Sequence, residues 1–156
     1  MDQYPEIPHN ALVLVGDGRI ALFLRNVGQP LRVKLEQVRL LQHETLRNQD
    51  LAADRPGRVV SGPGGHIKSG VEETDWHHLE ESRFVHTVAE AISRAALGEP
   101  SLEVVVVLPP KALGSFREAL SPSVRRHIVA EIPKDLAGHP VRDIERHLQG
   151  PGAGPK

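Results

Sequence analysis

The chain has 156 residues and a mass of 17.1 kDa, the size of one compact domain. Apolar residues make up 39% and charged residues 25%, so the chain can bury a core and is not a disordered segment. A formal charge of -1 excludes a basic field over the whole molecule, and the lack of cysteine excludes disulfides, thiolate metal sites and thiol nucleophiles.

The N-terminus carries no targeting pattern. Residues 1–10 are polar and acidic, without the basic start and apolar stretch of a secretory signal. No apolar run approaches the roughly 18 residues of a membrane span. We therefore expect a cytoplasmic protein without a membrane partner.

The opening part of the chain predicts a three-stranded meander. Residues 11–15 form a continuous apolar run typical of a strand covered on both faces, and residues 16–18, Gly-Asp-Gly, predict a turn into a second strand over residues 20–24. After a turn at residues 26–30, apolar positions alternate with a phase slip over residues 31–41. This pattern predicts a half-exposed edge strand with a bulge.

Residues 43–68 show no periodicity and are rich in glycine and proline, which predicts a long loop. Ser69 and Glu72 have the spacing of a capping box, so a helix should begin there. Apolar residues, including Leu79, then recur with helical spacing as far as Gly98. Such a helix is roughly 40 Å long, so its first turns should project beyond the sheet.

The second half of the chain alternates strands and helices. Residues 102–108, LEVVVVL, predict a buried parallel strand, and residues 111–120 predict a short helix. After a helical restart at residues 121–122, residues 126–132 favour a last strand, although they also fit a helix. A final helix should begin at Pro140.

These elements predict one α/β domain over residues 1–149, with the long loop at 43–68 and a disordered tail at 150–156. The crossover between the last two strands should be right-handed and parallel. The simplest result is a five-stranded mixed sheet in the order 3-2-1-4-5, with helices on both faces. This is a ribonuclease-H-like arrangement, and it does not specify a function by itself.

Three groups of residues have chemistry that deserves a test. Asp17 follows the first strand, where a nuclease of this fold class places a metal ligand, but its possible partners have no diagnostic spacing, so we expect a turn residue. His77, His78 and Glu81 fit a surface His–Glu contact better than a metal site, and Trp76 should anchor the core. The sequence lacks the Gly-x-Ser-x-Gly motif, so a serine hydrolase is disfavoured. We predict neither a metal nor a cofactor.

Several separated motifs resemble the bacterial family of proteins required for attachment to host cells. They are His9-Asn10-Ala11, Val15 to Ala21, Asp54 to Val59, Thr74 to His77, Glu80 to Phe84 and Ala130 to Leu136. Together they cover nearly the whole chain.

A more distant resemblance links the chain to the middle domain of archaeo-eukaryotic class I peptide-release factors. Gly64-Gly65-His66, placed before a long helix that carries Glu81-Ser82-Arg83, resembles the Gly-Gly-Gln loop of that domain. In that family the loop enters the ribosome and assists hydrolysis of the peptidyl-tRNA ester. Here His66 occupies the glutamine position, and it keeps the backbone N–H but not the side-chain amide.

The resemblance implies an RNA-contacting loop that is non-catalytic or weakly catalytic, with the ribosome or tRNA as partner. The expected contacts are Arg55, Arg58, Gly64, Gly65 and Lys68, because basic side chains engage phosphates and glycines let backbone approach a crowded partner. An ordinary solvated loop is the alternative. If the protein is an enzyme, His66 would place water for peptidyl-tRNA ester hydrolysis. An adhesion role, as the family name says, is a further alternative.

Overall fold

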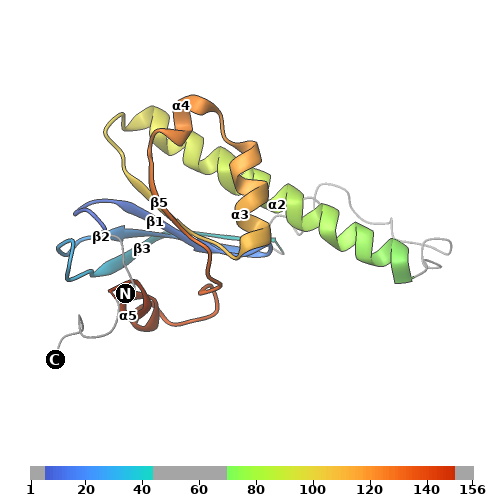
Figure 1. The fold of residues 1–156 in the computed structure, drawn as a ribbon, viewed down its shortest axis with the longest axis horizontal. Helices are drawn as coiled ribbons and strands as arrows, with labels where there is room; N and C mark the ends of the chain where they lie inside the picture. Colours follow the sequence, from blue (N-terminus) through green and yellow to red (C-terminus); the bar gives the residue numbers. More distant parts are fainter. Residues whose placement is uncertain (1–5, 44–69, 150–156) are drawn as a thin grey trace, which may run out of the picture.

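The computed structural model describes residues 6–43 and 70–149, with side chains described in these ranges except in residues 70–76. Within them lie the strands β1 (Leu12–Gly16), β2 (Ile20–Asn26), β3 (Leu35–Gln42), β4 (Val104–Val107) and β5 (Ile128–Ile132). The helices are α2 (Gly70–Gly98), α3 (Pro110–Ala119), α4 (Pro122–Arg125) and α5 (Val141–Gln149). The strands form one mixed sheet in the order β3-β2-β1-β4-β5 (Figure 1), which confirms the predicted fold class and strand order.

The strands β1 and β4 form the centre of the sheet. They run parallel, with Val15 opposite Val107, while β1 pairs antiparallel with β2 on its other side. Every residue of β1 and β4 is buried because side chains on both faces of the sheet are covered. Their continuous apolar sequences are therefore explained by their position.

Helices cover both faces of the sheet, as predicted (Figure 1). One core cluster joins α2, α3 and α4 to the sheet and includes Phe84, Ile92 and Phe116. The opposite cluster includes Ile144 and Leu148 of α5. Among residues 6–43 and 70–149, no helix is both long and apolar enough to cross a membrane.

The strand β3 confirms the predicted bulge but corrects the predicted start. Phe23 pairs with Arg39 and Leu24 pairs with Gln37, so one extra β3 residue is accommodated between them. The strand begins at Leu35 rather than at residue 31, and the Leu31 side chain is 66% exposed. Residues 31–34 belong instead to the turn that precedes β3.

Asn26 organises that turn and is the fully buried polar residue of the described core. Its Nδ2 donates to the Ile7 carbonyl at 2.8 Å. Its Oδ1 accepts from the backbone N–H groups of Gly28 at 2.9 Å and Lys34 at 3.0 Å. One amide thus joins the N-terminal segment to both sides of the β2–β3 turn, which is why the ladder starts only after Lys34.

The last strand and its flanking helices resolve the alternative left open by the sequence. Residues 128–132 form β5, parallel to β4, and not a helix. Arg126 and His127 lie in the preceding turn, so the strand is shorter than predicted. Ser121 precedes α4 as expected but makes no capping hydrogen bond with its side chain.

The helix α2 is longer than its packing against the sheet requires. It has 29 residues, or about 43 Å at about 1.5 Å per residue. Its first described buried side chain is Phe84, and the preceding Leu79 is 45% exposed. The prediction that the first turns project beyond the sheet is therefore confirmed (Figure 1), and Leu79, which fits the helical apolar spacing, lies in these exposed turns. We call residues 70–83 the arm.

Candidate functional site

The site residues predicted from the sequence lie outside the described residues. They are Arg55, Arg58, Gly64, Gly65, His66 and Lys68. The same holds for Ser69, for the Trp76 side chain, for nearly all of the predicted loop and for the tail at 150–156. The described residues nevertheless contain a crevice with polar walls at the base of the arm.

The crevice has a volume of about 310 Å³. It lies where the chain leaves the two central parallel strands, between the β1–β2 turn, α2 and the start of α3. The lining residues are Asp17, Gly18, Arg19, His78, Glu81, Ser82, Val85, Pro109, Lys111, Ala112 and Ser115.

The sheet topology explains why a hollow forms at this place. From the end of β1 the chain turns toward β2 on one side, and from the end of β4 it passes through α3 to β5 on the other side. The two connections diverge, so they leave space outside the carboxyl ends of the strands. Open α/β sheets bind ligands at such a switch point.

The first wall of the crevice is the tight β1–β2 turn. Asp17 Oδ1 accepts hydrogen bonds from the backbone N–H groups of Arg19 at 2.8 Å and Ile20 at 3.0 Å. The prediction that Asp17 is a turn residue is therefore confirmed. Within the described ranges, no group of three or more metal-ligating side chains is found. The Arg19 side chain is exposed at the rim.

The second wall is the part of α2 where the arm joins the body. A Cβ added at Gly18 would lie 2.9 Å from Glu81 Cγ and 3.0 Å from Glu81 Cβ, so the turn packs closely against this helix. Next to it, His43 Nε2 lies 3.0 Å from Glu80 Oε1, and the His43 ring meets Phe84 edge-on. These contacts join the ends of the β-meander to α2.

The predicted His–Glu contact is thus made by different residues. In the part of the chain that the structure describes, the His–Glu contact links His43 with Glu80, whereas His77 and His78 are exposed and make no such contact. His78 instead lines the crevice together with Glu81. The spacing within one helix suggested a local pair, whereas the observed pair joins residues that are distant in sequence.

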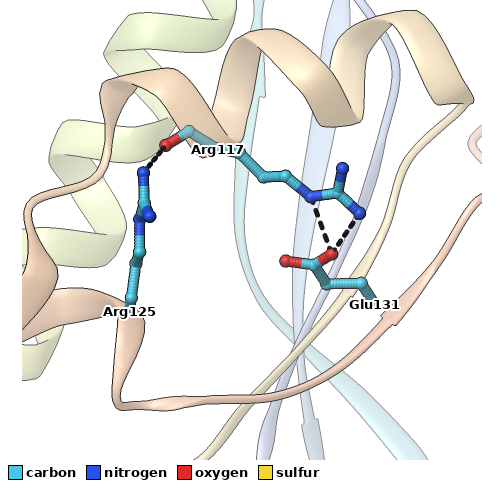
Figure 2. A network of polar contacts seen from close by, with 3 residues as sticks. All are labelled: Arg117, Arg125 and Glu131. Carbon is cyan, nitrogen blue, oxygen red and sulfur yellow. Dashed lines mark hydrogen bonds and ion pairs between the residues drawn. The ribbon is translucent and has the colours of Figure 1, made fainter.

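The third wall is α3. Polar contacts at the end of this helix far from the crevice link it to β5 and α4 (Figure 2). The Arg117 guanidinium donates from Nε at 2.8 Å and from Nη2 at 2.5 Å to Glu131 Oε1 on β5. Arg125 donates from Nη2 to the Arg117 carbonyl at 3.0 Å, which links α4 to α3. The hydrogen bond that Arg117 donates to Glu131, and then the charge of that carboxylate, raise the pKa of Arg117 above its ordinary value.

The crevice combines an apolar base with polar groups that remain available. Val85 and Ala112 are buried, while Arg19 and Lys111 are exposed at the rim. Across residues 6–43 and 77–149, neither of these two cations nor Glu81 forms an ion pair. The site can therefore present cationic donors, a carboxylate acceptor and an apolar surface to one small ligand.

Sequence reasoning missed this site because its residues come from three separate segments. The available signal was local: Gly16-Asp17-Gly18-Arg19 follows one continuous apolar run, and Pro109-Pro110-Lys111 follows the other. Once two such strands are taken as adjacent and parallel, their following residues must meet at one edge of the sheet. The contribution of Ser82 and Val85 required knowledge of where α2 crosses.

Comparison with known proteins assigns this architecture to a family. A family model described as "Protein required for attachment to host cells" matches residues 12–148, from the first residue of β1 to the last turn of α5. An uncharacterised protein of Rickettsia prowazekii (strain Madrid E) is 30% identical over 86 residues, 55% of this chain and 57% of the relative. The chain thus spans little more than half of that relative's length. Because the family model covers the whole sheet, the chain belongs to the family of proteins required for attachment to host cells.

Proposed function

We propose that this host-attachment family protein is a cytoplasmic RNA-binding protein. In this proposal it contacts the ribosome or tRNA through residues 55–68, which directly precede the arm. The observation that carries the proposal is the arm itself, a helical extension with no described buried side chain before Phe84. The resemblance of Gly64-Gly65-His66 to a release-factor loop supplies the kind of partner.

The arm is anchored at its base, and its first turns extend beyond the sheet (Figure 1). Phe84 and Val85 are buried in the core, Glu80 pairs with His43, and Glu81 packs against Gly18. Residues 70–79 extend about 15 Å beyond this anchor at about 1.5 Å per residue. An isolated helix of this length would be marginal in water, so its continuity with the anchored half supports it.

Charge favours contact through the preceding segment rather than through the arm. The arm sequence contains five acidic residues, Glu72, Glu73, Asp75, Glu80 and Glu81, against one arginine, Arg83, and two histidines. Phosphates would repel this helix, whereas Arg55, Arg58 and Lys68 give the preceding segment cations that phosphates attract. The negative charge of the arm therefore opposes contact with RNA along the helix, and the proposal assigns the contact to residues 55–68.

The test is co-sedimentation with ribosomes and binding of tRNA at low and moderate salt. Combined Arg55→Ala, Arg58→Ala and Lys68→Ala should weaken binding and reduce the log–log salt slope by about 2, because each phosphate contact contributes about 0.7–0.9. Combined Arg94→Ala, Arg126→Ala and Arg142→Ala removes the same charge from exposed positions elsewhere and should bind as the parent does. Equal loss in both triple variants, or no binding by the parent protein, would refute the proposal.

The cytoplasmic location is proposed together with this function. Cell fractionation should place the protein with the ribosome-containing soluble fraction. Recovery at the outer surface of the cell would instead support a direct adhesion role, which is the literal sense of the family description.

A further inference from the structure

We propose that the crevice at the base of the arm binds one nucleotide, either a free nucleoside monophosphate or the phosphate-bearing end of a strand. The lining residues do not include any of residues 55–68, and a ligand here would contact the β1–β2 turn, α2 and α3 at the same time. The proposal does not depend on the RNA-binding segment.

The size of the crevice sets the size of the ligand. Small-molecule pockets in proteins span roughly 300–1,000 Å³, and this one, at about 310 Å³, is at the lower end. It therefore suits one nucleotide rather than a dinucleotide cofactor. A second described hollow beside β5 is larger, about 520 Å³, but its polar groups Arg117 and Glu131 already satisfy each other.

The crevice is lined by two carboxylates, of which Asp17 already accepts hydrogen bonds from its own turn, and by two exposed cations that are open to an anionic group. Arg19 belongs to the β1–β2 turn and Lys111 to the first turn of α3, so the two cations come from different walls. Neither is neutralised by an ion pair within the described residues. A phosphate held between them would gain charge-assisted hydrogen bonds from both walls.

The remaining lining suits the other two parts of a nucleotide. Val85 and Ala112 are buried apolar residues against which a flat base can pack. Glu81 offers an acceptor for ribose hydroxyl groups, and Ser82 and Ser115 can donate or accept. Inorganic phosphate would use only the cations, so the apolar and carboxylate lining distinguishes a nucleotide from a simple anion.

The experiment is a titration of the full-length 15N-labelled protein with AMP, CMP, GMP and UMP, followed by amide chemical shifts. Saturable shifts at Gly18, Ser82 and Ser115 are expected for at least one nucleotide. Adenosine and inorganic phosphate should each bind at least about tenfold more weakly than AMP, because each offers only part of the contacts. A tetraribonucleotide with a terminal phosphate, compared with the same strand without it, tests whether the nucleotide can be a strand end.

Variants locate the contact. Lys111→Ala and Arg19→Ala should each weaken binding about tenfold, whereas Arg142→Ala, an exposed change on α5 across the sheet, should leave it unchanged. Both Lys111 and Arg19 are exposed, so their loss should not disturb folding, which thermal unfolding checks. Inorganic phosphate binding as tightly as AMP would overturn the proposal, as would unchanged binding in the Lys111→Ala variant or no shifts with mononucleotide and phosphorylated strand alike.

Discussion

Replacing Asn26 with alanine removes the amide that joins the N-terminal segment to the β2–β3 turn. The change would remove the partner of the Ile7 carbonyl and of the N–H groups of Gly28 and Lys34, while the Pro8 and Gln29 carbonyls would lose only a longer contact and keep other hydrogen bonds. At about 1–1.5 kcal/mol for each unsatisfied group, the free energy of unfolding should fall by about 3–4 kcal/mol. Single domains have about 5–15 kcal/mol in total, so this loss is a large part of it.

Urea unfolding followed by circular dichroism measures this loss. With a slope of about 2 kcal/mol per molar urea, the midpoint should fall by about 2 M. Gln29→Ala removes an exposed amide from the same turn and should change the free energy by less than about 0.5 kcal/mol. Asn26→Leu preserves most of the volume and should still be strongly destabilised. A loss below about 1 kcal/mol in Asn26→Ala would refute the reasoning, because water would then be replacing the amide.

Three further changes test the turns and the remaining catalytic hypothesis. Asn10 has a φ of 74°, which glycine adopts readily and a β-branched residue does not. In urea unfolding, Asn10→Gly should therefore leave the free energy of unfolding unchanged or slightly higher, and Asn10→Val should lower it by about 1–2 kcal/mol. Gly18→Ala should lower the free energy of unfolding by about 1–3 kcal/mol because its new Cβ would meet Glu81. The double variant with Glu81→Ala should regain part of this loss, as measured by thermal unfolding. If the protein hydrolyses peptidyl-tRNA through backbone action, release from a stalled complex should survive His66→Ala and disappear in Gly65→Val; the reverse order would indicate a side-chain base.

The order of the sheet could be predicted because its central strands have unambiguous sequences. The apolar runs at residues 11–15 and 102–108 are expected only in strands that are covered on both faces. Once these two strands are paired in parallel, the places of the other three strands follow. The local details could not be predicted in this way. Leu31 fits the alternation of β3, yet the turn around Asn26 delays the strand to Leu35.

The surroundings of Leu79 and Asn26 could not be predicted from the sequence, for one common reason. Periodicity reports which side chains share a face of an element, but it does not report whether a partner faces them. Leu79 lies on the apolar side of α2 at a point where the helix has already left the sheet, and so it is 45% exposed. Asparagine is common in surface turns, but Asn26 is buried because the N-terminal segment packs against it and accepts its hydrogen bond. Both outcomes depend on tertiary placement.

The exposed turns of the arm contribute little to the free energy of unfolding, which supports the proposal that they serve a function. The described buried contacts of α2 lie between Phe84 and Ala96, a stretch of about 20 Å at about 1.5 Å per residue, which covers the sheet. Residues 77–79 are exposed, so their side chains add little burial, while ordering each of them costs conformational entropy. The crevice, in contrast, follows from the strand topology and uses only the base of the arm, where His78, Glu81 and Ser82 form one of its walls. The described packing of α2 therefore does not account for its exposed first turns, and the proposed function rests on this extension.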